Sequence, residues 1–124
     1  MQLAADTHVQ ANVILGYDGG VLRLRGRLVE SSAIVTASEV RAWAATSAET
    51  LSPELFEPVL ALGVDVVLLA TGRRQLWPPP AVLAHLAARR IGLEVMDTGA
   101  ACRTFNLLVG DGRPVALAAI LPLR

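Results

Sequence analysis

Residues 64–70 read Val-Asp-Val-Val-Leu-Leu-Ala, and this apolar run decides the fold class. The run has the length of one strand, and nearly continuous apolar residues are typical of a strand that is covered on both faces. A glycine precedes the run at Gly63, and a glycine-containing loop, Thr71–Pro79, follows it. The sequence therefore predicts a buried strand here, inside an α/β sheet.

Downstream of this run, helical and extended patterns alternate. Val82 and Leu86 belong to an apolar stripe at helical spacing, and the period changes again after Gly92. Short right-handed crossovers between such elements make at least the first two strands parallel. The predicted elements are a helix over Pro80–Ile91, a strand over Leu93–Met96, a helix that Thr98 caps and whose stripe includes Ala101 and Phe105, and a strand over Pro114–Leu121.

Upstream, the pattern predicts one helix and leaves one segment open. Ser52 is suited to an N-cap and Pro53 to the first helical position, where the missing N–H costs nothing. The helix is expected to stop at Gly63, because glycine is favoured just past a helix end. The residues over Ser38–Thr50 fit either a helix or an extended segment.

The N-terminal part predicts a β-hairpin. Asn12–Tyr17 and Val21–Val29 flank Asp18-Gly19-Gly20, and glycines tolerate the positive φ of tight hairpin turns. In the second run, alternate positions place Arg23, Arg25 and Arg27 on one face of a half-buried strand. Those guanidinium groups are either a solvated face or an anion-binding ridge. A further short strand is expected over Ala33–Thr36.

Composition limits the class of protein. The chain has 124 residues, of which 53% are hydrophobic and 18% charged, so we expect a single domain over residues 1–124 and no disordered chain. Its 11 basic residues, all arginine, balance 11 acidic ones, which argues against nucleic acid and anionic membranes as partners. Apolar runs stay near strand length, and residues 1–10 lack the pattern of a signal peptide. We therefore expect a cytoplasmic protein without membrane insertion.

Two loops that follow predicted parallel strands are the candidate ligand site. Ligands of open α/β sheets usually bind outside the carboxyl ends of the strands, and unpaired N–H groups of a following helix favour anions. The alternative is that Gly72 merely lets the chain turn and that the arginines are solvated or paired. The candidate ligands for a small anion, such as a phosphate or carboxylate, are Thr71, Gly72, Arg73, Arg74, Thr98, Arg103 and Asn106.

Glu94 and Cys102 are the other residues with chemical potential. Alternation points Glu94 toward one face of a short apolar strand, where a carboxylate needs a partner, so a structural ion pair with Arg113 or Arg103 is predicted. Cys102, the one cysteine, lies in the first turns of a helix beside Arg103. That position lowers a thiol pKa, whereas burial among apolar neighbours makes cysteine inert.

The two tryptophans differ in context. Trp43 has no special surroundings and is expected in the core. Trp77 precedes Pro78-Pro79-Pro80, which form a stiff and partly apolar loop. Trp77 is expected to cover the core, with contact to a partner or ligand as the alternative.

Catalytic and metal motifs are missing from the sequence. It contains no Gly-x-Ser-x-Gly elbow, no His-Glu-x-x-His pair and no Cys-x-x-Cys spacing. We therefore assign no catalytic residue, no metal ligand and no cofactor, and we expect a protein without catalytic activity.

Most of the chain resembles a known family. The residues that carry the resemblance are Gly63–Gly72, Gly112–Val115 and above all Glu94–Asn106, with its Glu, Met and Thr followed by Ala and then Arg-Thr-aromatic-Asn. They are similar to a small α/β domain family of largely unknown function, whose eukaryotic members include mitochondrial complex I (NADH dehydrogenase) assembly factor 3 and the adipogenesis-associated Mth938-domain protein. The resemblance implies a three-layer α/β fold with a central mixed sheet and no established cofactor or catalysis. It also favours an extended strand over Val40–Ala45.

Two functions fit these observations. The first is a non-catalytic interaction module of the assembly-factor kind, whose partner is another protein or a second copy of the chain. The second is a protein or enzyme that binds a small anionic metabolite at the loops after Ala70 and Met96.

Overall fold

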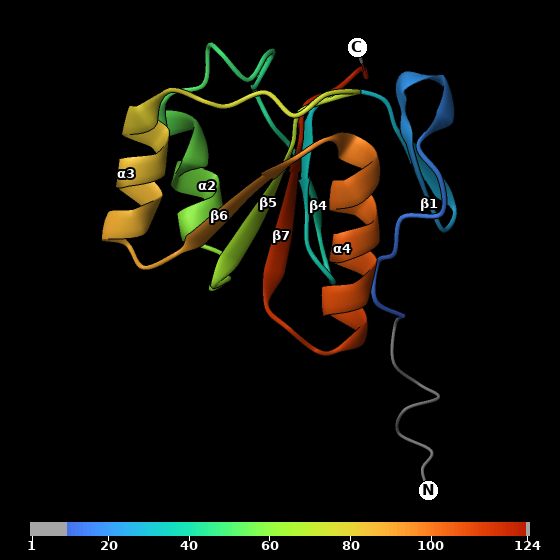
Figure 1. The fold of residues 1–124 in the computed structure, drawn as a ribbon. Coiled ribbons are helices and arrows are strands. Elements are labelled where there is room, and N and C mark those ends of the chain that lie inside the picture. The colour runs from blue at the N-terminus through green and yellow to red at the C-terminus, as the bar shows by residue number, and fades with distance from the viewer. Residues whose placement is uncertain (1–9, 124) are drawn as a thin grey trace, which may run out of the picture.

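A five-stranded mixed sheet forms the middle of the computed structural model, which describes residues 10–123 (Figure 1). The strands are β3 (Ala33–Val35), β4 (Val40–Ala42), β5 (Val66–Ala70), β6 (Gly92–Met96) and β7 (Val115–Ala119). The order across the sheet is β4-β3-β7-β5-β6. Strand β5 is parallel to both of its neighbours, β6 and β7, whereas β3 is antiparallel to β7 and β4.

Strand β5 is buried on both faces, as the apolar run predicts. Val67 and Leu69 belong to one hydrophobic cluster, and Leu68 and Ala70 belong to the other. All four are fully buried. Because its side chains alternate between the two clusters, this strand joins the two halves of the core. Each buried Val or Leu side chain stabilises the fold by about 1.5–3 kcal/mol.

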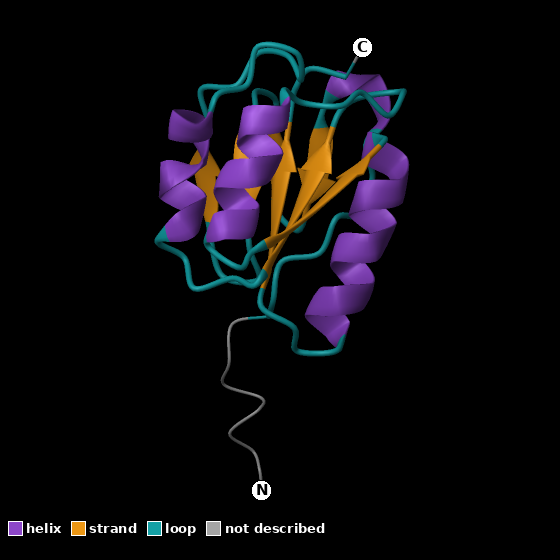
Figure 2. Ribbon diagram, turned by 60° about the vertical axis from the view of Figure 1, so that its left-hand side comes forward, coloured by secondary structure: helices purple, strands orange, loops and turns teal. Residues whose placement is uncertain are grey.

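Helices and a hairpin cover the two faces of the sheet, which gives three layers (Figure 2). Helices α2 (Glu57–Leu60) and α3 (Pro80–Ala88) cover one face, and α4 (Thr98–Gly110) covers the other together with the hairpin of β1 (Leu22–Leu24) and β2 (Arg27–Val29). The predicted three-layer α/β fold with a mixed sheet and an N-terminal hairpin is confirmed.

The turn of the N-terminal hairpin lies in a different place from the predicted one. β1 and β2 pair antiparallel around Gly26, whose φ is +71°, so the predicted strand over Val21–Val29 is folded back on itself. Asp18–Gly20 forms a 3-10 turn, and the only trace of the predicted first strand within residues 10–123 is a bridge between Gly16 and Arg23. Gly26 lies inside an alternating pattern, and that pattern hid the turn.

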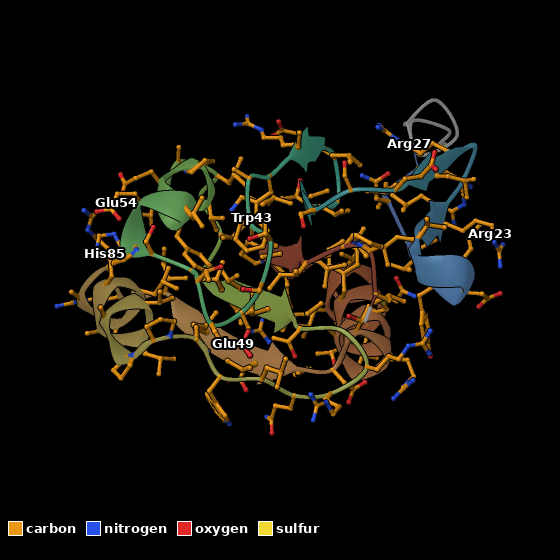
Figure 3. All side chains as sticks on the ribbon, turned by 90° about the horizontal axis from the view of Figure 1, so that it is seen from above. Arg23, Arg27, Trp43, Glu49, Glu54 and His85 are labelled. Atoms are coloured by element: carbon orange, nitrogen blue, oxygen red, sulfur yellow. The ribbon has the colours of Figure 1, made fainter. Side chains whose placement is uncertain are left out.

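The predicted helix after Ser52 is shorter and in two parts. A 3-10 helix, η2 (Pro53–Phe56), leads into α2, and Ser52 makes no side-chain capping bond. Pro58 explains the break, because proline has no N–H to donate and restricts the residue before it. His85 Nε2 lies 3.2 Å from Glu57 Oε2 and joins α3 to α2 at the end of the molecule opposite Arg23 and Arg27 (Figure 3).

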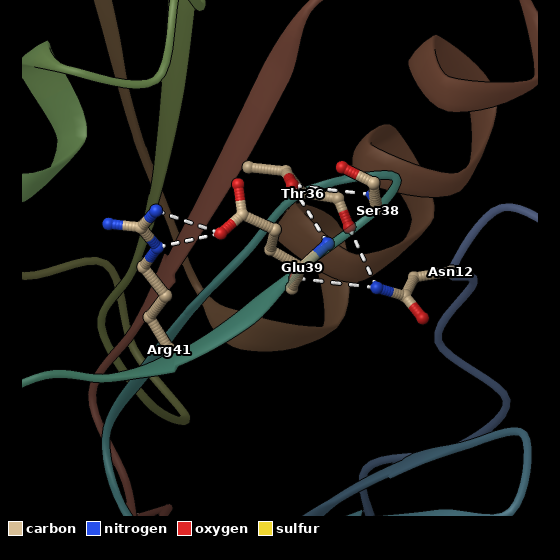
Figure 4. A network of polar contacts seen from close by, with 5 residues as sticks. All are labelled: Asn12, Thr36, Ser38, Glu39 and Arg41. Carbon is tan, nitrogen blue, oxygen red and sulfur yellow. Dashed lines mark hydrogen bonds and ion pairs between the residues drawn. The ribbon is translucent and has the colours of Figure 1, made fainter.

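A polar network fixes the turn between β3 and β4 (Figure 4). Thr36 Oγ1 accepts from the Ser38 and Glu39 amides at 3.3 and 3.1 Å, and Asn12 Nδ2 donates to Thr36 O at 2.9 Å. The Glu39 carboxylate pairs with Arg41 at 2.8 Å. The sequence left residues 38–50 as either helix or extended structure. The structure has strand β4 at the start of this segment, in agreement with the extended structure that the family resemblance implies.

Candidate functional site at the carboxyl ends of the parallel strands

The loops after β5 and β6 meet, as predicted, and are bonded to each other. The Gly72 amide donates to Thr98 Oγ1 at 2.9 Å, and the Thr98 amide donates to Gly72 O at 2.7 Å. The chain leaves β5 toward α3 on one face and leaves β6 toward α4 on the other face. Ligands of α/β sheets bind in such a crevice, and here a reciprocal pair of hydrogen bonds spans it.

The predicted anion ligands are divided between two cavities. Gly72, Arg73, Thr98 and Arg103 line a cavity of about 410 Å³ on the α4 side. Thr71 and Arg74 line a separate cavity of about 240 Å³ that Gly72 also borders. The structure thus brings four of the seven predicted residues together in one cavity.

The larger cavity carries both signs of charge. Asp18 and Asp97 line it together with Arg73 and Arg103. Asp97 is the N-cap of α4, since its Oδ1 accepts from the Ala100 amide at 3.0 Å. The helix N-terminus therefore already has a carboxylate from its own chain, which satisfies part of its attraction for an anion.

Thr98 was expected to cap α4, and that expectation is wrong by one residue. Thr98 is the first helical residue and is almost completely buried. Its hydroxyl accepts from the Gly72 amide and so serves the bond between the two loops. Aspartate and threonine are both good N-caps, and sequence alone did not show that a glycine amide 26 positions away would use the threonine.

Thr71 organises the loop in which it lies. Its hydroxyl donates to the carbonyl of Arg74 and accepts from the Leu76 amide at 3.0 Å. Its own amide donates to Met96 O at 3.0 Å. With these bonds made, the Thr71 side chain fixes the shape of the loop.

Asn106 lies outside both cavities, so its predicted place in the anion site is wrong. Its Nδ2 donates to Ile14 O at 2.9 Å, and its Oδ1 accepts from the Ile14 amide at 2.7 Å. Both ends of the amide are used to hold the segment before β1 against α4. The partner is 92 positions away, a distance over which sequence pattern carries no signal.

Glu94 is exposed, so the prediction of a buried carboxylate is wrong. Strand β6 lies at the edge of the sheet, where alternate side chains reach solvent. Arg113 is also exposed, and the ion pairs among residues 10–123 are Glu39–Arg41 and Glu57–His85. The structure therefore gives Glu94 and Arg113 no structural ion pair.

Cys102 is a buried core residue of α4. Burial raises the pKa of the thiol to about 12, and this effect outweighs the neighbouring Arg103 guanidinium, which lowers the pKa. Because the thiolate is the nucleophile, a thiol with this pKa is inert at neutral pH. The sequence left Cys102 as either a reactive thiol with a lowered pKa or an inert buried one, and the structure shows the inert buried thiol.

Tyr17 is a cavity residue that the sequence did not reveal. Arg103 Nη1 donates to Tyr17 Oη at 3.2 Å, and both line the larger cavity. The ring lies so close to Gly99 that a Cβ at that position would be 2.9 Å from Tyr17 Oη. The absence of a side chain at Gly99 thus makes room for the tyrosine, but no local pattern connects two residues so far apart.

The two tryptophans lie in opposite environments. Trp43 is buried, packs edge-on against Phe56 with ring centroids 5.5 Å apart, and donates from Nε1 to Leu55 O at 2.7 Å. Trp77 is 59% exposed, so its expected role as a cover for the core is wrong. The stiff sequence around Trp77 positions the ring in solvent.

Comparison with known proteins agrees with the fold. Residues 14–120 match the family described as Protein of unknown function (DUF498/DUF598). The chain belongs to this family. An NMR structure of a Xanthomonas campestris protein superimposes with a TM-score of 0.85 at 36% identity, covering 98% of this chain and 93% of that one.

Two curated relatives carry descriptive names. NADH dehydrogenase (ubiquinone) 1 alpha subcomplex assembly factor 3 of Mus musculus is 30% identical over 115 residues, which cover 91% of this chain and 62% of that protein. The 13 kDa major membrane protein of Francisella tularensis subsp. holarctica is 34% identical over 62 residues, half of each chain. The resemblance to the assembly-factor family is therefore confirmed, and the chain spans half to about three fifths of these two relatives.

Within residues 10–123, none of the helices has both the length and the apolar character that a membrane crossing requires.

Proposed function

We propose that this chain is a non-catalytic protein-interaction module of the assembly-factor kind, acting in the cytoplasm. The likeness to assembly factor 3 over 91% of the chain carries this proposal. The partner is another protein, and self-association into a homo-oligomer is the alternative form of the same activity.

The side chains that suggested chemistry, in the candidate site and next to it, support a role in binding. Thr71 and Asn106 are used in internal hydrogen bonds, and the buried Cys102 thiol has a raised pKa. Catalysis needs a nucleophile or base that reaches substrate at the working pH. These three side chains instead hold the fold together and leave the exposed surface for partners.

A deletion experiment tests this function. In cells that lack the chain, we expect at least one multiprotein complex to run at a smaller size on native gels, and the full chain to restore it. The Arg103→Ala variant is expected to restore the complex as well, since assembly does not use the cavity that this arginine lines. A complex profile that is the same with and without the chain contradicts the proposal.

A second candidate function is binding of a small anion. It is favoured by one observation, that Arg73 and Arg103 line the same cavity of about 410 Å³. The cavity also holds Asp18 and Asp97, so a bound anion must compete with the chain's own carboxylates.

Inorganic phosphate is a suitable probe for this candidate. A ligand at free concentration c that binds only the folded state stabilises it by RT ln(1 + c/Kd), so the melting temperature of the intact chain should rise as phosphate is added. The Arg73→Ala/Arg103→Ala variant should lose this shift, and Arg113→Ala, which removes an exposed arginine outside the cavity, should keep it. An equal shift in all three proteins shows that phosphate acts nonspecifically and contradicts the site.

A further inference from the structure

We infer that the loop between β5 and α3, residues 71–79, docks onto an acidic protein surface that offers an apolar pocket for Trp77. The inference rests on the proposed interaction function and names the surface and the chemistry of its partner. We call these residues the Trp77 loop. Three features of this loop support the inference: an exposed aromatic ring, a fixed backbone and two arginines without a carboxylate.

The ring of Trp77 is the largest apolar group that the loop gives to solvent. It is 59% exposed, and no hydrogen bond joins its indole N–H to another part of the described chain. Tryptophan is among the residues that most often dominate the energy of protein interfaces, because one ring buries a large apolar area and also donates a hydrogen bond. Burial of this ring in a partner recovers apolar surface that the fold leaves in water.

Hydrogen bonds and prolines hold the Trp77 loop in one shape. Thr71 Oγ1 bridges the Arg74 carbonyl and the Leu76 amide, and Gln75 Nε2 donates to Val95 O on β6 at 2.9 Å. The prolines Pro78–Pro80 then fix φ directly after the tryptophan. A ring presented on an ordered loop loses little conformational entropy on binding, which favours affinity.

The charge of this surface specifies an acidic partner. Residues 71–79 contain two arginines, Arg73 and Arg74, and no aspartate or glutamate. Arg73 and Arg74 are exposed, and neither takes part in the two ion pairs found among residues 10–123. Asp18, Asp97 and Glu49 line the cavities beside them, and none of the three is in an ion pair with these arginines. Tryptophan and arginine are both enriched in interface hot spots, and on a protein surface arginine binds carboxylates through paired, charge-assisted hydrogen bonds.

Site-specific photo-crosslinking in cells that naturally make the protein tests the inference. A benzophenone amino acid replaces Trp77 in the full chain, and a matched chain carries it at Leu107. Leu107 is a suitable control because its side chain is 65% exposed but lies on α4, away from the Trp77 loop. Crosslinked peptides are sequenced, and the yield is measured again with Arg73→Gln/Arg74→Gln and at high salt.

The expected result is a crosslink from position 77 to another protein, at an apolar residue flanked by Asp or Glu. The double arginine variant and high salt should each lower its yield about tenfold, because rim arginines act through charge. Crosslinks to a non-acidic segment, to lipid or to a second copy of this chain overturn the inference. If position 107 crosslinks to protein and position 77 does not, the surface is wrong while the interaction function stands. If neither position crosslinks, both fail.

Discussion

Trp43 and Trp77 stand at comparable places, each in the loops at one end of the sheet, but they serve opposite purposes. Trp43 is a core residue: its ring packs on Phe56, and its indole N–H donates a hydrogen bond to Leu55 O. Trp77 has a rigid backbone and an exposed ring. The difference shows that a residue type does not disclose its role, whereas its packing and bonding do.

The same division separates the other residues that suggested chemistry. Asn106, Thr71 and Cys102 resemble Trp43. The polar groups of Asn106 and Thr71 are engaged in internal hydrogen bonds, and the Cys102 thiol is buried in the core. Arg73 and Arg74 resemble Trp77, because they are exposed and take part in neither ion pair of residues 10–123. Substitutions in the first group should change stability, and substitutions in the second should change binding.

The largest effect is expected for Trp43→Ala. This change removes a buried aromatic side chain, leaves a cavity beside Phe56 and strands the Leu55 carbonyl without its donor. Such truncations lower the free energy of unfolding by about 3–5 kcal/mol. Urea denaturation of the variant and of the unchanged chain measures it. A loss below about 1 kcal/mol would place Trp43 in the same class as Trp77.

A smaller effect, visible only at high pH, is expected for Cys102. The folded thiol has a pKa of about 12 and the unfolded thiol about 9.0, so above pH 9 the unfolded state loses its proton first. Stability therefore falls as pH rises from 9 toward 12, by up to about 1.4 kcal/mol per pH unit. Cys102→Ala should remove this part of the slope. Equal slopes in the two proteins, measured by urea denaturation across this range, would show that the thiol is not held neutral by burial.

A still smaller effect is expected for Thr71→Val, which keeps the shape of the side chain and removes its hydroxyl. The Leu76 amide then loses its acceptor, at a cost of about 1 kcal/mol. The change also loosens the Trp77 loop, so amide hydrogen exchange at Leu76 should become faster while the amides of β7 keep their protection. Unchanged exchange at Leu76 would show that the prolines and the Gln75–Val95 hydrogen bond hold the loop without the Thr71 hydroxyl.

The smallest effect on stability is expected for Trp77→Ala. Since the ring is mostly in solvent, the free energy of unfolding should change by no more than about 0.5 kcal/mol. Parallel urea denaturation with Trp43→Ala makes the comparison directly. A loss of 2 kcal/mol or more would mean that Trp77 covers the core after all.

Much of the fold followed from sequence because its information is local. An unbroken apolar run predicts strand β5, and apolar stripes at helical spacing predict α3 and α4. The hairpin turn was misplaced because Gly26 sits inside an alternating pattern that also fits one long strand. Local pattern does not show where a strand folds back.

The candidate site was harder to predict, because its contacts join distant residues. The loops after β5 and β6 were expected to meet, and Gly72 and Thr98 do. Whether a side chain there is free depends on partners such as Ile14 for Asn106, which no spacing reveals. The burial of Glu94 was predicted wrongly because it depends on the order of the strands. That order places β6 at the edge of the sheet, and it is a long-range property that local pattern does not show.

The most direct test of the Trp77 loop as an interaction surface is complementation of cells that lack the chain, read as restoration of the multiprotein complex on native gels. Trp77→Ala is compared with Arg113→Ala, an exposed substitution outside the Trp77 loop, after both are shown to be as stable as the unchanged chain. We expect Arg113→Ala to restore the complex and Trp77→Ala to leave it at the smaller size. Full restoration by Trp77→Ala would contradict this role of the Trp77 loop.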